Sequence, residues 1–286
     1  MGVRMPVQAI RSQDFSATVV LSMLAAIVLL AGLAAGFIIF STMKSDDRAL
    51  QRQSRLVTHM LDRTRTDTIA EQVYTAAWDD AVIALSGEID MKWVADNLGY
   101  GTFDDYGYNR VYVLDPAGKA VYAMRDGGDV PADSWSEAAD TIQPIVDRLA
   151  ELDAVAAISA YNNDFADIPD ATDFASVEGR PALVSAVPIL SETEEHLVDA
   201  GNSFTFVAVR FLDDALALEL TEQFLLEGAA FTTDPTPVAG TALVPITNSV
   251  GDTVAWFRWQ PDRPGAALLA ETMPLFAGAL ALAAAF

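Results

Sequence analysis

The sequence joins two uncharged apolar segments through a long acidic middle. Phe15–Met43 contains no charged residue, and neither does Met273–Phe286. A helix needs about 20 apolar residues to cross the hydrocarbon core of a bilayer, and the first segment exceeds that length. The layout predicts a chain that enters a membrane, builds a polar domain on one side of it, and turns back towards the membrane.

A cleavable signal peptide is the alternative interpretation of the first segment. The apolar region of such a peptide is only about 7–15 residues long and ends at small residues, which Ala34–Gly36 resemble. Phe37–Phe40 extends the apolar run past that point and favours a retained membrane helix. Gly32 and Gly36 have the spacing of a motif that lets two membrane helices approach closely, although small residues are frequent in any alanine-rich span.

The second apolar segment is too short to cross a bilayer, and it lacks the polar face of an amphipathic helix. We therefore expect it to begin a second membrane helix, and we expect a longer gene product. The predicted organisation is a cytoplasmic tail over residues 1–14, a transmembrane helix over 15–43, an extracytoplasmic sensor domain over 44–272, and the start of a second transmembrane helix over 273–286.

Basic residues near the first span do not by themselves set the orientation. More of them follow the span than precede it, namely Lys44, Arg48, Arg52 and Arg55. The positive-inside rule alone would place the middle domain in the cytoplasm, but large domains are translocated largely regardless of charge. We expect the middle domain to lie outside the cytoplasm.

The negative charge of the chain restricts its partners. The sequence has 40 acidic and 17 basic residues and a net charge of −23. Nucleic acids and anionic membrane surfaces attract positively charged proteins, so we expect no nucleic-acid partner. The absence of cysteine excludes disulfides and thiolate metal sites.

Catalytic motifs are missing from the sequence. His59 and His196 are the only histidines and form no HExxH motif, and no P-loop, nucleophile elbow or dinucleotide fingerprint occurs. Asn162–Asp164 lacks the glycine and the terminal glutamate of a calcium-binding loop. We expect no enzymatic activity, cofactor or metal within this chain.

Periodicity and turn chemistry predict an α+β domain in which helices flank one antiparallel sheet. The predicted helices are Asp46–Leu85, Met91–Asn97, Ser134–Ala160 and one capped by Asp213 or Asp214. The predicted strands are Arg110–Leu114, Lys119–Met124, Pro181–Val187, Phe204–Val209, Thr241–Ile246 and Thr253–Trp259. Asp115–Gly118 has the residues of a tight hairpin turn. The predicted loops are Asp126–Asp133, Asn162–Asp173 and Thr232–Gly240.

Three stretches carry a resemblance to a known family. They are Tyr74-Thr75-Ala76-Ala77-Trp78-Asp79-Asp80, then Trp93 with Asp96-Asn97-Leu98, and then Asn109 before Val111-Tyr112-Val113-Leu114-Asp115 with Gly118. Over Ser41–Phe211 the chain resembles the fourth class of CHASE sensor domains. The resemblance implies an extracellular receptor domain between two membrane spans, with a fold similar to PAS and Cache domains. It also implies a cytoplasmic diguanylate cyclase, phosphodiesterase or histidine kinase downstream. Family members more often carry an aromatic residue around positions 75–77, where this chain has Thr75 and two alanines.

Trp78, Asp79 and Asp80 are the first candidates for ligand contacts. Consecutive helical residues splay around the axis, so only one of the carboxylates is expected to face a ligand. That carboxylate would receive a cationic or hydroxylated molecule while Trp78 supplies a flat apolar wall. The alternative is that Trp78 packs on the sheet while an aspartate accepts hydrogen bonds from a loop backbone.

The other candidate ligand contacts each have a structural alternative. Trp93 would alternatively pack in the core, and Asn97 would alternatively be a residue at the end of a helix. Tyr112 and Tyr122 lie on facing strands and would flank a pocket or stabilise the sheet as a cross-strand pair. Arg180 and Arg210 would hold a carboxylate ligand or form structural ion pairs. Asn109, which opens a strand, completes the set.

These expectations combine into a sensory hypothesis. A small molecule or physical cue would act on the outer domain, shift the long helix and change the geometry of a homodimer, which requires that the cue favour one of two arrangements. The alternative is a membrane-anchored interaction domain outside the cell without enzymatic output. A contiguous apolar patch with no enclosed pocket would be typical of that alternative.

Overall fold

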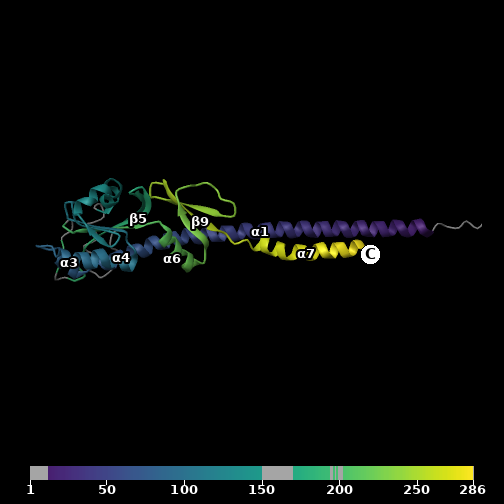
Figure 1. Ribbon diagram of the computed structural model, residues 1–286, viewed down its shortest axis with the longest axis horizontal. Helices are drawn as coiled ribbons and strands as arrows, with labels where there is room; N and C mark the ends of the chain where they lie inside the picture. The colour runs from purple at the N-terminus through teal and green to yellow at the C-terminus, as the bar shows by residue number, and fades with distance from the viewer. Residues whose placement is uncertain (1–11, 150–169, 194–195, 197, 199–201, 286) are drawn as a thin grey trace, which may run out of the picture. The chain divides into compact units, whose positions relative to one another are not determined.

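A computed structural model describes residues 12–149, 170–193, 196, 198 and 202–285 (Figure 1). The chain divides into two compact units. One unit comprises the residues up to Arg52 together with Asp262–Phe286, and the other comprises Gln53–Pro261. Most of the cytoplasmic tail predicted over residues 1–14 lies outside the described residues.

Helix α1, Ser12–Ala76, is 65 residues long and contributes to both units. It contains no proline, so no backbone donor is missing from its hydrogen-bond ladder. Among the described residues, α1 is the one helix that is long and apolar enough to cross a membrane. Large apolar side chains such as Leu21 and Phe37 are each 71% exposed near its start. The predicted long N-terminal apolar helix is therefore confirmed, continuous with the helix that follows it.

Helix α7, Pro264–Ala285, belongs to the same unit as the start of α1. The Asp46 carboxylate of α1 accepts hydrogen bonds from the amides of Gly265 (2.6 Å) and Ala266 (3.1 Å), two of the donors that the start of a helix leaves unpaired. A Cβ atom on Gly265 would lie 2.0 Å from the Thr42 carbonyl oxygen, so glycine permits this close approach. The helical segment begins at Pro264, earlier than the Met273 predicted from the sequence.

Six antiparallel strands form the main sheet of the second unit, in the order β3-β2-β1-β6-β5-β4. Their bounds are β1 Arg110–Leu114, β2 Ala120–Arg125, β3 Gly128–Val130, β4 Ala171–Val177, β5 Arg180–Pro188 and β6 Thr205–Phe211. The β1–β2 hairpin and the two strands predicted after it are confirmed. Two predicted loops are corrected, because β3 lies in one and β4 begins inside the other.

Both faces of this sheet are buried. Val111 and Val113 of β1 face a core closed by the end of α1 and the helices that follow it. Tyr112 and Leu114 face a second core, closed by the 3-10 helix η2, Ala132–Glu137, and by helical residues 139–149. The end of the helix predicted over Ser134–Ala160 lies outside the described residues. Burial on both sides explains why β1 reads as a continuous apolar run.

A second sheet has the order β7-β9-β8, so the prediction of a single sheet was wrong. Its strands are β7 Glu227–Thr232, β8 Ala242–Thr247 and β9 Thr253–Gln260, and β7 was missed. Helix α6, Asp214–Phe224, begins as predicted with the Asp213 carboxylate capping the amides of Ala215 and Leu216. Phe257 and Trp259 pack with Met60 of α1 in a third, separate core.

Two predicted helix boundaries near the first core are also corrected. The helix predicted over Asp46–Leu85 is interrupted, because α1 ends at Ala76, Trp78 is extended, and α2 covers Asp79–Leu85. The helix predicted over Met91–Asn97 continues as α3 Met91–Val94, a π-helical turn η1 Ala95–Tyr100 and α4 Gly101–Tyr106 (Figure 1). A Cβ on Gly99 would lie 1.9 Å from the Tyr122 hydroxyl, so this glycine permits close packing and does not end the helix.

Candidate functional site: two cavities beside the end of α1

The first cavity, the Trp78 cavity, lies where α1 ends and has a volume of about 440 Å³. Its wall on the α1 side is formed by Tyr74, Thr75, Ala77 and Trp78. The rest of the wall comes from η1, α4 and the segment after β5, namely Asp96, Asn97, Gly101, Thr102, Asp105, Tyr106 and Glu192. Two of the candidate ligand contacts named from the sequence, Trp78 and Asn97, line this cavity.

Aromatic side chains supply the flat parts of this wall. Tyr74 is 79% exposed, and Trp78 is half-buried. The Trp93 ring packs on Trp78 with centroids 5.2 Å apart and an angle of 55° between the planes, but it does not line the cavity. Trp93 therefore packs against Trp78 and the first core, which is the structural alternative stated for it. The Asn97 side-chain amide donates to the Trp93 carbonyl (2.8 Å) and ties the two residues together.

Asp79 faces a loop and does not line the cavity. Its Oδ1 accepts from the Ser191 hydroxyl (2.6 Å) and from the amides of Glu192 (3.1 Å) and Thr193 (3.2 Å), and its Oδ2 accepts from the Thr193 hydroxyl (2.5 Å). Burial opposes the charge of Asp79, but these hydrogen bonds outweigh it and hold its pKa below the usual 3.8. Asp80 is exposed and also lies outside the lining. The loop-binding alternative therefore describes Asp79.

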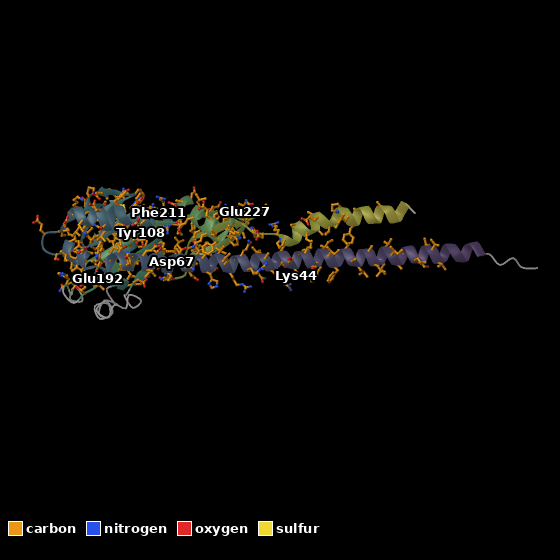
Figure 2. All side chains as sticks on the ribbon, turned by 90° about the horizontal axis from the view of Figure 1, so that it is seen from below. Lys44, Asp67, Tyr108, Glu192, Phe211 and Glu227 are labelled. Atoms are coloured by element: carbon orange, nitrogen blue, oxygen red, sulfur yellow. The ribbon has the colours of Figure 1, made fainter. Side chains whose placement is uncertain are left out.

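The acidic residues that do line the Trp78 cavity were not singled out from the sequence. They are Asp96, Asp105 and Glu192, the last of which lies at the edge of the unit (Figure 2). Lys92, one turn before Asp96, forms an ion pair with it. Tyr74 and Tyr106 were missed as well.

The second cavity, the Arg210 cavity, has a volume of about 650 Å³. Asp105 and Tyr106 at the end of α4 line both cavities. Arg210 is only 14% exposed, and its guanidinium forms an ion pair with Glu219 of α6. Asn109 lines this cavity too, but its side-chain oxygen accepts from the Phe211 amide (2.9 Å). Both predicted residues therefore have structural partners.

Glu71 of α1 gives the Arg210 cavity an unusual electrostatic environment. Its Oε2 is buried and has no hydrogen-bond partner among the described residues. Burial raises the pKa of Glu71, Arg210 opposes that shift, and the charges of Asp67 and Glu219 add to it. The neighbouring Tyr108 has its pKa raised well above 10.0, mainly by burial and then by Glu71.

The remaining predicted site residues, Tyr112, Tyr122 and Arg180, do not line either cavity. Tyr112 and Tyr122 are offset by one register position and face opposite cores, so they do not flank one pocket. Tyr112 packs edge-on against Trp135 with centroids 4.9 Å apart, and Tyr122 donates to Asp129 (2.7 Å). Arg180 forms an ion pair with Asp213 (3.3 Å) and lies 3.7 Å from the Phe211 ring centroid. The structural alternatives describe these contacts.

Metal-binding geometry is not found in the part of the chain that the structure describes: no three or more histidine, aspartate or glutamate side chains gather there as a metal site would require.

The described residues thus form an α+β domain with a cavity beside the end of a long helix. The family model described as CHASE4 domain matches residues 60–231, and the chain belongs to this family of extracellular sensor domains. The resemblance seen in the sequence is thereby confirmed, and because the family is sensory, catalysis within the chain is not expected. The search of curated proteins found no match.

Proposed function

We propose that this chain is the extracytoplasmic sensory region of a bacterial transmembrane signalling protein, and that the Trp78 cavity receives the cue. The observation that carries the proposal is the position of the cavity. Tyr74 and Thr75 lie in the last turn of α1, and Ala77 and Trp78 follow it directly; all four line the cavity. The first part of the same helix is the candidate membrane span. A cue that prefers one arrangement of these residues would bias the whole helix.

Hydrogen bonds attach α1 to the main sheet near its end and to α7 nearer its start. The Gln72 side chain, which is fully buried, donates to the carbonyls of Ser185 (3.1 Å) and Phe206 (2.8 Å) and fixes α1 on the main sheet. In the other unit, Asp46 holds the start of α7. A shift of α1 would therefore also move α7.

The finer parts of the proposal follow from the family. We propose a tail over residues 1–14 in the cytoplasm, a span over 15–43, a periplasmic PAS/Cache-like domain over 44–272, and a second span that starts within α7. The output would be a cytoplasmic cyclic-di-GMP enzyme or histidine kinase, controlled through a homodimer. A cavity of this size favours ligand reception over the alternative of an interaction domain without output.

A binding screen tests the sensory role. The full chain in detergent micelles is heated with a panel of small cations, anions and neutral molecules, and its melting temperature is measured. We expect at least one compound to raise the melting temperature, and we expect Trp78→Ala to abolish that rise. A panel without any stabilising compound would count against a small-molecule role.

A further inference from the structure

We propose that the Trp78 cavity selects an organic cation, such as a quaternary ammonium compound or a polyamine. The inference rests on the proposed sensory function and names the chemical class of its ligand. Three independent properties of the cavity support it: the aromatic wall, the sign of the charges around it, and the fixed positions of its polar groups.

Three aromatic residues, Tyr74, Trp78 and Tyr106, line the cavity and can contact a bound cation. The faces of indole and phenol rings carry negative potential, and a cation held over such a face is attracted to it. Trp78 is held by Trp93 behind it, Tyr74 is largely exposed, and Tyr106 closes another side. Such a wall also covers the apolar methyl or methylene groups of an organic ammonium ion, which a metal ion lacks.

The charges around the cavity repel anions. Its described lining contains three carboxylates, Asp96, Asp105 and Glu192, and no lysine or arginine. Lys92 pairs with Asp96 from outside, which leaves Asp105 and Glu192 to set the local potential. The net charge of −23 on the whole chain has the same sign and would raise the local concentration of cations.

The polar groups are already in place before a ligand binds. Asp79 holds the backbone amide of Glu192 and therefore fixes the segment that carries the Glu192 carboxylate. Asn97 is fixed by its hydrogen bond to the Trp93 carbonyl. Pre-organisation of this kind reduces the ordering cost of binding. The volume of about 440 Å³ lies in the range of small-molecule sites.

The test titrates the full chain in detergent micelles with four probes. Choline and spermidine represent the two kinds of organic ammonium, and 3,3-dimethylbutan-1-ol has the shape of choline without its charge. Glutarate is the anionic probe. Binding is measured by isothermal titration calorimetry. Quenching of tryptophan fluorescence is compared between the unaltered chain and Trp78→Ala, because the chain has five tryptophans and the difference isolates the signal of Trp78.

We expect choline or spermidine to bind, and we expect the neutral alcohol to bind about tenfold more weakly than choline or worse. Trp78→Ala should weaken cation binding about tenfold, whereas Trp78→Phe, which keeps a ring face, should retain most of it. Glu192→Gln should weaken binding a few fold at low salt and less at high salt. Glu222→Gln, which removes an exposed carboxylate of α6 outside both cavities, is the matched control and should change nothing.

Two outcomes separate this inference from the proposed function. Binding of the alcohol as tight as that of choline, or binding of glutarate alone, overturns the choice of a cation but keeps a sensory cavity if Trp78→Ala still removes the binding. Failure of both cations to bind overturns the inference. If Trp78→Ala does not fold, as judged by circular dichroism, the double variant Asp105→Asn/Glu192→Gln decides, and unchanged cation affinity in it overturns the inference.

Discussion

The two cavities share a wall but differ in the charges that their lining leaves for a ligand. Asp105 and Tyr106 border both of them. In the Arg210 cavity the one cation among the described lining residues, Arg210, is already paired with Glu219, and the Asn109 side chain accepts a hydrogen bond from the Phe211 amide. In the Trp78 cavity the aromatic faces and the Glu192 carboxylate point to an external partner. The larger cavity is therefore the poorer candidate for a receptor site, and volume alone does not identify function.

Removal of the Arg210 charge should have the largest effect on the stability of the protein and separates the structural role of the Arg210 cavity from the binding role of the Trp78 cavity. Arg210→Met leaves Glu71 and Glu219 without their cation and should lower the free energy of unfolding by about 1–2 kcal/mol, less than for a fully buried pair because Glu219 is 55% exposed. Chemical denaturation measures the loss. Arg180→Met, which removes a more exposed ion pair, is the control and should cost less. A large loss of cation affinity in Arg210→Met would contradict the structural role assigned to Arg210.

Glu71 should make the Arg210 cavity sensitive to pH. Its pKa is raised in the folded protein, so its contribution to stability is full below pH 4.5 and is lost as the pH rises through the folded pKa. Glu71→Gln removes the ionised form and should raise the melting temperature at neutral pH, with the gain disappearing below pH 4.5. Thermal melts across pH measure this difference. A melting temperature that falls at neutral pH would contradict the assignment.

Asp79 should show the opposite pH dependence beside the Trp78 cavity. Its folded pKa is lowered, so its stabilising effect is present above the unfolded value of 3.8 and is lost as the pH falls through the folded pKa. Asp79→Asn should lower the melting temperature slightly at neutral pH, because the carboxylate is only partly buried, and should have no effect in strong acid. The same variant should weaken cation binding, since Glu192 loses its support.

A substitution in the wall that the two cavities share should have the smallest effect of these variants. Asp105→Asn removes one exposed charge from both cavities, and it should weaken cation binding about two- to fivefold without a change in stability. Calorimetry with choline or spermidine, whichever binds the unaltered chain, measures the affinity, and a thermal melt measures the stability. An unchanged affinity would mean that Glu192 alone sets the potential of the Trp78 cavity.

Local chemistry predicted much of the fold. The Asp115–Gly118 turn and the Asp213 cap act over a few residues, and the structure has both. Strand β3 was missed although Asp126-Gly127, with positive φ at both residues, is a hairpin signal. The break after Ala76 had no local signal, because it depends on the pairing of Ala77 with Leu190, more than a hundred residues later.

The sequence identified individual residues of the cavity wall but not the set of residues that forms it. Trp78 and Asn97 line the cavity, but the adjacent Asp79 and Asp80 do not, since the extended backbone at Trp78 starts a new helix and redirects them. Asp105 and Glu192 reach the cavity from α4 and from the segment after β5. Their positions depend on tertiary packing, which composition and spacing do not encode.

Labelling of single cysteines tests the central claim that the domain receives its cue outside the cytoplasm. The natural chain has no cysteine, so Glu222→Cys in α6 and Gln8→Cys before the first apolar segment each create one reporter. A membrane-impermeant maleimide should label Glu222→Cys in intact spheroplasts and Gln8→Cys only after lysis. Labelling in the reverse pattern would place the domain in the cytoplasm and contradict the proposed sensory role.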